Sequence, residues 1–474
     1  MHGPIVAAKT IESGQFDTRY VWLISAAAAL GGLLFGYDWV VIGGAKPFYE
    51  QYFELRSTQA IGWANSCALV GCLAGSIVSG WISERFGRKK LLLLAAALFA
   101  ISSAFTALAT NFSMFVTWRI IGGVAIGIAS NVSPTYIAEV SPAAWRGRLV
   151  ALNQLTIVLG ILAAQIVNWL IADRVPEGAT AQMIRQSWNG QFGWRWMFAA
   201  VIVPSLIFFT AAIFVPESPR WLVKSGIRER ARSTLSRIGG SAYANAALED
   251  IQSTLASESR SQAALADLLR SGVLKALSIG VVLAVLQQWS GINVIFNYAE
   301  EIYRSAGYGV SDILFNIVIT GAINMVFTLI ALGFVDKLGR RPLMLLGCAG
   351  VGTCHLLIGL AYRLGFGGLP VLILTLGAIG CYAMSLAPVT WILISEIFPN
   401  RIRGLAISIS VSALWIASFI LTYSFPVINS AIGSAGVFWL YAGICFAGLI
   451  FIAVRVPETK GKTLEQIERD LAAS

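Results

Sequence analysis

Long apolar stretches separated by short polar loops follow one another along the whole sequence. Twelve of them reach about 20 residues, the length that an α-helix needs to cross a bilayer. They are predicted at 21–43, 61–82, 90–110, 113–136, 149–170, 195–215, 274–297, 312–335, 342–363, 369–394, 405–428 and 434–456. The pattern predicts an all-α membrane protein with six transmembrane helices in each half.

One polar stretch divides the apolar pattern in two. Residues 216–273 carry many charges among Ala, Leu and Ser, with a period near 3.6 that indicates amphipathic helices on the water side. The predicted order is therefore an N-terminal segment (1–20), a first six-helix bundle (21–215), an intracellular helical domain (216–273), a second bundle (274–456) and a C-terminal tail (457–474).

Charged motifs repeat at a fixed offset between the two halves. The run Glu84-Arg-Phe-Gly-Arg-Lys89 recurs as Asp336-Lys-Leu-Gly-Arg-Arg341, and Glu139…Arg146-Gly recurs as Glu396…Arg403-Gly, each about 250 residues later. A duplicated set of membrane helices is typical of transporters. We therefore expect two pseudo-symmetric bundles.

Charge sets the expected orientation. Only 12% of the residues are charged and 57% are hydrophobic, and Lys and Arg concentrate in loops of one parity. The positive-inside rule then places both termini in the cytoplasm, and the first apolar stretch, which lacks a signal-peptide pattern, is expected to remain as a span. The net charge of +10 suits an anionic lipid leaflet and gives no support for nucleic-acid binding.

Metal and redox chemistry have little support. The six cysteines all fall within predicted spans without a metal-type CxxC spacing, and the chain has only two histidines. We expect no metal, no cofactor and no enzymatic activity.

An acid and an arginine inside the first bundle are candidates for proton coupling. Asp38 lies about two-thirds of the way along the first span, where an ionised carboxylate costs about 2.5–3.5 kcal/mol. Arg119, in the fourth span, is its candidate partner, and protonation of Asp38 would release the pair. A static structural ion pair is the alternative interpretation.

Neutral amides gather in the seventh span at Gln287, Gln288, Asn293 and Asn297, around a possible bend at Gly291. Amides both donate and accept hydrogen bonds, so the cluster favours an uncharged, hydroxyl-rich ligand, although amides also join helices to one another. Further polar or aromatic side chains inside spans are Gln154, Gln165, Asn324, Trp391 and Trp415.

Acidic and basic residues occur side by side at the helix ends that should face the cytoplasm. Topology alone needs only Lys and Arg, so the added acids favour salt bridges of a cytoplasmic gate over simple anchoring. The predicted gate residues are Glu84, Arg85, Arg88, Glu139, Arg146, Glu217, Arg220, Asp336, Arg340, Arg341, Glu396, Arg403 and Glu458.

Four motifs together resemble the sugar porter family of the major facilitator superfamily. They are the Gly80–Lys89 loop, Pro216-Glu-Ser-Pro-Arg-Trp-Leu222, Gln287-Gln-x-x-Gly-x-Asn293 and Pro457-Glu-Thr-Lys-Gly461, and the resemblance covers roughly residues 20 to 466. It implies two six-helix bundles, an intracellular helical domain and a monosaccharide bound near the midplane by Gln154, Gln287, Gln288, Asn293, Asn324 and Trp391. The aromatic Trp415 is added as a sugar contact.

Within this family the chain is similar to bacterial proton-linked xylose and hexose symporters, which have an acid and an arginine at the positions of Asp38 and Arg119. It departs from them at Val201, Ile161, Leu414 and Asn297-Tyr298. The expected function is a proton-coupled monosaccharide symporter, working as a monomer in a bacterial inner membrane by alternating access. A facilitative uniporter, a polyol or inositol transporter and a non-transporting sugar sensor remain alternatives, since closely related substrates differ by few contacts.

Overall fold

The computed structural model describes residues 16–176, 178–260, 271–398, 402–460, 462 and 466, and within helices it leaves the side chains of 257–260, 271–272, 336 and 403 undescribed. The described part is almost wholly helical and contains no strand. The helices of the first half are α1 (Thr18–Tyr52), α2 (Thr58–Phe86), α3 (Arg88–Ala107), α4 (Phe112–Val140), α5 (Arg146–Ile171), α6 (Ala181–Gln186), the π-helix η2 (Asn189–Gly193), α7 (Trp194–Ala199) and α8 (Ile202–Phe214).

Two helices follow the first half. They are α9 (Pro219–Lys224) and α10 (Arg228–Arg260). The helices of the second half are α11 (Ser271–Trp289), α12 (Ile292–Asn297), α13 (Ala299–Ser305), α14 (Val310–Leu338), α15 (Arg340–Arg363), α16 (Leu369–Met384), α17 (Leu386–Glu396) and α18 (Arg403–Arg455).

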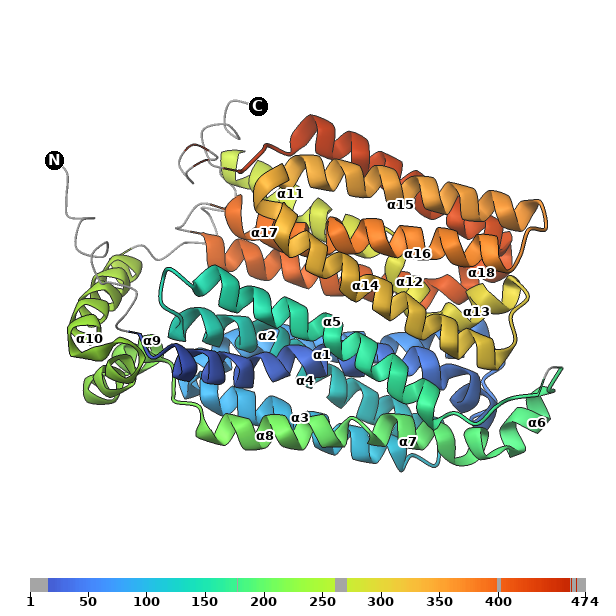
Figure 1. Cartoon of the computed structure of the whole chain (residues 1–474), viewed down its shortest axis with the longest axis horizontal. Coiled ribbons are helices and arrows are strands. Elements are labelled where there is room, and N and C mark those ends of the chain that lie inside the picture. Colours follow the sequence, from blue (N-terminus) through green and yellow to red (C-terminus); the bar gives the residue numbers. More distant parts are fainter. Residues whose placement is uncertain are drawn as a thin grey trace.

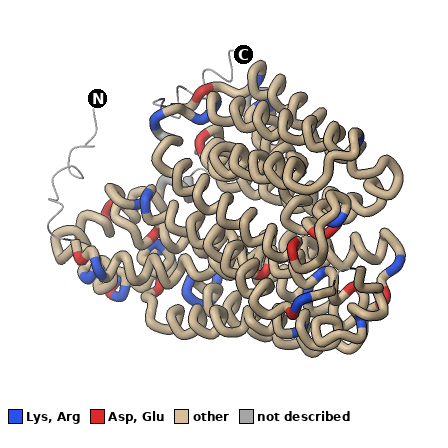
Figure 2. Tube along the Cα trace, turned by 45° about the vertical axis from the view of Figure 1, so that its right-hand side comes forward, with Lys and Arg blue, Asp and Glu red and all other residues tan. Residues whose placement is uncertain are grey.

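The two halves lie side by side as two bundles of roughly parallel rods (Figure 1). One end of the assembly carries α9 and α10, and we call it the α10 end. The opposite end carries α6 and α13, and we call it the α6 end. Most charged residues lie toward these two ends and few lie between them (Figure 2), as expected for a protein whose middle is surrounded by lipid.

The described residues contain eleven helices long and apolar enough to cross a membrane. The last of them covers 52 residues, Gly404–Arg455, which would make a straight helix of about 78 Å. It is divided by non-helical backbone at Gly433 and so supplies two crossings. The twelve predicted spans are therefore all present as helices.

Side-chain caps fix where several of these helices begin. Asp17 accepts a hydrogen bond from Tyr20 N at the start of α1, Ser57 accepts one from Ala60 N before α2, and Asn111 does the same for Met114 N before α4. A side-chain oxygen at this position satisfies a backbone N–H that has no partner within the helix. These polar residues separate the apolar runs and thus define the helix boundaries.

Some predicted spans differ from the helices. The first apolar span was expected to end at residue 43, and α1 continues past it to Tyr52, through Lys46, whose side chain contacts glutamates inside the protein. The seventh span is broken between Trp289 and Ile292, and the tenth is broken at Ser385. Apolar composition predicts that a segment crosses the membrane but does not register such interruptions.

Helices α9 and α10 form a small layer with its own apolar centre. Leu222 of α9 packs with Leu235 and Leu248 from the two arms of α10, which turns back at Gly239 and Gly240. Phe16 packs edge-on against Trp145 and Tyr243, so the start of the first bundle also contacts this layer. The amphipathic helices predicted in 216–273 are present up to Arg260, and residues 261–270 lie outside the described part.

Candidate transport site

Asp38 and Arg119 form a buried ion pair inside the first bundle. Asp38 is 2% exposed and Arg119 is 3% exposed, and Nη1 of Arg119 lies 2.9 Å from Oδ1 of Asp38. A second guanidinium nitrogen, Nη2, donates to the Asp38 carbonyl oxygen over 3.3 Å. The predicted contact between the first and fourth spans therefore forms.

The pair leaves hydrogen-bonding capacity unused. Oδ2 of Asp38 and Nε of Arg119 are buried and have no hydrogen-bond partner. Gly122 lies beside Oδ2 and also next to Ser102, and the guanidinium lies 5.3 Å from the centre of the Phe198 ring. Because buried polar atoms are normally satisfied, the free carboxylate oxygen is a position where a proton could bind.

The amides of the seventh span form a connected network. Nε2 of Gln288 donates to Oε1 of Gln287 over 3.1 Å, and the side-chain amide of Asn293 donates to Oε1 of Gln288. Gln287 also reaches the Ala387 carbonyl oxygen over 3.4 Å. All three side chains are buried, so the expected amide cluster faces the protein interior and not the lipid.

A break in the helix positions this network. Helix α11 ends at Trp289 and α12 begins at Ile292, and Gly291 between them has φ +86°, a backbone conformation that favours glycine. The freed carbonyl oxygen of Ser290 lies 2.8 Å from Nε2 of His355, which must donate because a carbonyl only accepts. His355 is fully buried and was not anticipated as a functional residue. A single histidine inside an apolar span was the only sequence signal for it.

The remaining predicted sugar contacts occupy both bundles. Gln154 is partly exposed on α5, Asn324 is buried on α14, and Trp391 on α17 is 37% exposed. Trp415 is buried on α18 with its indole N–H unpartnered, and its ring centre lies 6.0 Å from that of Phe35. The structure thus brings Trp415 against the first bundle, whereas Trp391 remains partly open.

Gln165 of α5 is a further candidate that the predicted sugar-binding set left out. It is 1% exposed, and neither its amide nitrogen nor its amide oxygen has a partner. A methyl group at Gly321 of α14 would overlap Oε1 of Gln165, so this amide reaches from one bundle to the other.

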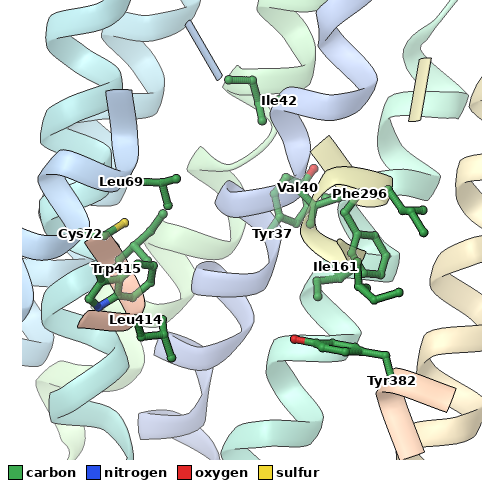
Figure 3. Close-up of a cluster of buried hydrophobic side chains, with 14 of the residues drawn as sticks. Tyr37, Val40, Ile42, Leu69, Cys72, Ile161, Phe296, Tyr382, Leu414 and Trp415 are labelled. Atoms are coloured by element: carbon green, nitrogen blue, oxygen red, sulfur yellow. The ribbon is translucent and has the colours of Figure 1, made fainter. Parts of the chain in front are cut away.

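Aromatic and aliphatic side chains from the two halves cover the same region. Figure 3 shows Tyr37 and Val40 of α1 near Ile161 and Phe296, with Tyr382 of α16 beyond them, and Trp415 beside Leu69 and Cys72 of α2. Apolar rings next to unpartnered amides make the mixed surface that suits a sugar, which has hydroxyl edges and C–H faces.

Predicted gate residues of the first half form a clamp at the α10 end. Arg88 pairs with Glu84 over 2.7 Å and with Glu139 over 3.0 Å. The carboxylate of Glu217 accepts hydrogen bonds from the backbone N–H groups of Arg88 and Lys89, which begin α3. A carboxylate at a helix N-terminus is favourable because N–H groups point toward it.

The second half repeats this clamp. Arg340 pairs with Glu396 over 3.2 Å, and Glu458 accepts from the backbone N–H groups of Arg340 and Arg341 at the start of α15. Although burial favours the neutral acid, N–H donors from Lys460, Arg340 and Arg341 lower the pKa of Glu458. The repeated motifs in the sequence therefore correspond to one structural unit built twice.

These ion pairs each join helices of one half. At the α10 end they brace each half separately, and the predicted role of these charges as a cytoplasmic gate stays a prediction. Among the other predicted gate residues, Arg85 is exposed and lies against the Trp81 and Phe86 rings, and Arg146 is exposed at the start of α5. Arg220 lies at the start of α9, and the side chains of Asp336 and Arg403 lie outside the described part.

An ion cluster at the α6 end joins the halves. Lys46 of α1 is 1% exposed and contacts three carboxylates: Glu50 over 3.0 Å, Glu300 of α13 over 3.2 Å, and Glu301 of α13. The cluster was not predicted, because Lys46 and the two α13 glutamates are more than 250 residues apart in the sequence. The only signal was a charged residue next to an apolar span.

The two ends differ in how tightly the halves meet. At the α6 end the backbones approach closely, since a methyl group at Gly43 would overlap the Phe296 carbonyl oxygen and one at Gly62 would overlap that of Tyr423. Toward the α10 end, a cavity of about 220 Å³ lies between α2, α4 and α18, lined by residues that include Ser79, Asn131 and Ser408. The halves therefore meet more closely at the α6 end than around this cavity.

Comparisons with known proteins agree with this architecture. Residues 24–471 match the family described as "Sugar (and other) transporter". The chain is 40% identical to the arabinose-proton symporter of Bacillus subtilis (strain 168), with 95% of each chain covered. It is 37% identical to the D-xylose-proton symporter of Escherichia coli (strain K12), with 96% of each chain covered.

Among solved structures, a partially occluded inward-open conformation of the xylose transporter XylE from E. coli matches with a TM-score of 0.82 and 35% identity. The match covers 94% of this chain and 100% of the other. The predicted fold, two six-helix bundles of the major facilitator type, is thereby confirmed, as is the prediction of a transporter that is not an enzyme. The chain belongs to the sugar porter family of the major facilitator superfamily.

Proposed function

We propose that this protein is a proton-coupled monosaccharide symporter that works by alternating access. The observation that carries the proposal is the buried Asp38–Arg119 pair with a free carboxylate oxygen. A charged pair inside a membrane bundle is costly to maintain, and protonation of Asp38 would remove one of its charges. The pair can therefore change state with each transport cycle.

The amide network is the proposed sugar site. Gln287, Gln288 and Asn293 of the second bundle hydrogen-bond to one another, and a sugar hydroxyl can replace each of these contacts without leaving a buried amide unpaired. Gln154 and Gln165 of the first bundle, Asn324, Trp391 and Trp415 complete the proposed set. D-xylose-type pentoses and D-glucose-type hexoses are the candidate substrates.

The expected cycle follows from the two ends of the bundle. We place the α10 end in the cytoplasm and the α6 end outside, in a bacterial inner membrane, with the transporter acting as a monomer. Asp38 takes a proton from outside, sugar binds to the amides, the halves rock, and both ligands leave toward the α10 end. The cavity between α2, α4 and α18 is the proposed exit.

The two clamps at the α10 end have a supporting role in this cycle. Because Arg88 pairs with Glu84 and Glu139, and Arg340 pairs with Glu396, each clamp holds the cytoplasmic helix ends of its own half together. We propose that the cytoplasmic gate opens by separation of two braced halves. The exposed Arg85 and Arg146, with Arg220, Asp336 and Arg403, complete this set of charges.

Uptake into proteoliposomes tests the proposal. Radiolabelled D-xylose and D-glucose are supplied with and without an inward proton gradient, to the wild type and to Asp38→Asn. Gradient-driven accumulation that is lost in Asp38→Asn, while counterflow exchange persists, supports symport. The matched control is Asp173→Asn, which removes an exposed aspartate and should accumulate sugar like the wild type.

Other outcomes identify the alternatives. Equilibration that ignores the gradient would make the protein a facilitative uniporter, in which the Asp38–Arg119 pair is static. If myo-inositol is accumulated and neither sugar is, the site is one for polyols. Binding of sugar without any uptake would indicate a sensor.

A further inference from the structure

The ion cluster at the α6 end has an uneven balance of charge. Lys46 contacts Glu50, Glu300 and Glu301, and Glu300 also pairs with Arg304 over 2.5 Å. Two basic side chains thus face three acidic ones. One negative charge is left without a partner when all five groups are ionised.

Burial makes this excess costly. Glu50 and Glu300 are less than a tenth exposed and Lys46 is 1% exposed, whereas Arg304 is about half exposed, so water weakens the compensation that Arg304 provides. Oε2 of Glu301 has no hydrogen-bond partner. An uncompensated buried charge is usually removed by protonation.

No other charged group supplies the missing positive charge within the described contacts of the cluster. The neighbouring titratable groups are phenols, Tyr49 of α1 and Tyr298 between α12 and α13, and the Tyr298 ring lies 5.6 Å from Nζ of Lys46. Both phenols are neutral at physiological pH. Burial raises the pKa of Glu301, which lies beyond the end of the seventh span, to about 8.

The cluster exists only when the halves meet at this end. Lys46 and Glu50 belong to α1 of the first bundle, whereas Glu300 and Glu301 belong to α13 of the second. Separation of the bundles would expose the carboxylates to water, where each has an ordinary pKa near 4.3 and stays ionised. The closed arrangement alone concentrates three carboxylates around one lysine.

We propose that closure of the α6 end binds one proton, shared between Glu50 and Glu301, at a site separate from the Asp38–Arg119 pair. Protonation brings the cluster to two acids and two bases and so removes its excess charge. Glu50 and Glu301 titrate as one unit because they interact strongly. Low pH therefore favours the arrangement that is closed at the α6 end, and high pH favours its opening.

The linkage has a defined size. If closure binds one proton more than the open arrangement does, the ratio of closed to open molecules changes by up to about tenfold per pH unit. The dependence should be present between the ordinary carboxyl pKa and the raised one. At a pH above the raised carboxyl pKa, the closed state either forms with its excess negative charge or is rarely populated.

Spin-label distances test this inference without sugar or a membrane gradient. Labels on cysteines introduced at the exposed positions Gln59 and Ser430, at the α6 ends of α2 and α18, report closure by double electron–electron resonance from pH 5 to 9. The six native cysteines are replaced, and Asp38→Asn removes the other proposed proton site from all samples. The readout is the slope of the logarithm of the closed-to-open ratio against pH.

We expect a slope approaching one proton in the parent and a slope near zero, with a high closed fraction, in Glu301→Gln. Glu50→Gln should behave in the same way and serves if Glu301→Gln does not fold. Lys46→Met should need a lower pH to close. The control Glu54→Gln, which removes an exposed carboxylate at the same end that pairs with Arg185 of its own half, should keep the parental slope.

Two results would overturn the inference: a parental closed fraction that is independent of pH, or a slope that both glutamine variants retain. Neither result bears on proton-coupled uptake, because sugar transport is not measured. Conversely, failure of Asp38→Asn to alter uptake would leave the slope intact. The two proposals can therefore fail separately.

Discussion

The hydrogen bond from His355 to the Ser290 carbonyl oxygen should control sugar affinity from outside the sugar site. His355→Leu keeps a side chain of similar bulk but removes the donor, and the carbonyl retains only Cys445 Sγ, a weak donor 3.7 Å away. An unsatisfied buried carbonyl costs about 1–3 kcal/mol. The backbone break between α11 and α12, which positions Gln288 and Asn293, would then have its binding-competent conformation in a smaller fraction of the molecules.

The cost converts directly into affinity. When only a fraction of the molecules is competent to bind, the apparent Kd rises by the reciprocal of that fraction, so a loss of 1–3 kcal/mol raises the Kd by at most about 5- to 150-fold. Titration of D-xylose and D-glucose by tryptophan fluorescence or calorimetry measures it. As a control, an antibody fragment that binds α10, away from the sugar site, should bind His355→Leu with unchanged affinity.

The glutamine variant is the decisive control. The side-chain amide of His355→Gln can still donate to Ser290, so its affinity should lie within a few-fold of the wild type, while His355→Leu falls far below it. If both variants bind sugar equally weakly, the ring contacts of His355 with Phe438 and Tyr441 determine the affinity and the hydrogen bond does not. An unchanged Kd in His355→Leu would refute the reasoning altogether.

Two further predictions concern stability. Arg119→Gln leaves Asp38 buried without its cation and should destabilise the protein by about 3–5 kcal/mol, which a lower Tm in detergent would report. Adding Asp38→Asn to this variant should recover part of the lost stability. Equal Tm values for Arg119→Gln and the wild type would contradict the prediction. Glu458 has a lowered pKa in the folded protein, so its stabilisation is present above the unfolded carboxyl pKa of about 4.3 and is lost as the pH falls through the folded value. Thermal melts from pH 7 to 3 should therefore converge for the wild type and Glu458→Gln at the acidic end, and a constant difference between them would argue against it.

Much of the fold could be predicted because the membrane imposes simple rules. The length of apolar runs fixed the twelve crossings, and the repeated charges indicated two similar halves. The contact of Asp38 with Arg119 followed from the cost of leaving an acid alone in an apolar helix. These inferences needed only local composition and the chemistry of single residues.

Other features depend on partners that are remote in the sequence. Lys46 of α1 contacts Glu300 and Glu301, which come from the other half, and its place in the sequence does not reveal these partners. Likewise, His355 gains its partner from a helix break 65 residues away. The clamps were recognised as charge clusters, but the helices that their ion pairs join became known only from the folded arrangement.

The completeness of each clamp within its own half has an evolutionary consequence. A six-helix ancestor with the Arg88–Glu139–Glu217 arrangement would have been braced before any second copy existed, so duplication could proceed without an unstable intermediate. After duplication each copy could drift in sequence while keeping its own clamp. The first copy is then free to specialise around Asp38 and Arg119 and the second around its amides, as the proposed transport cycle requires.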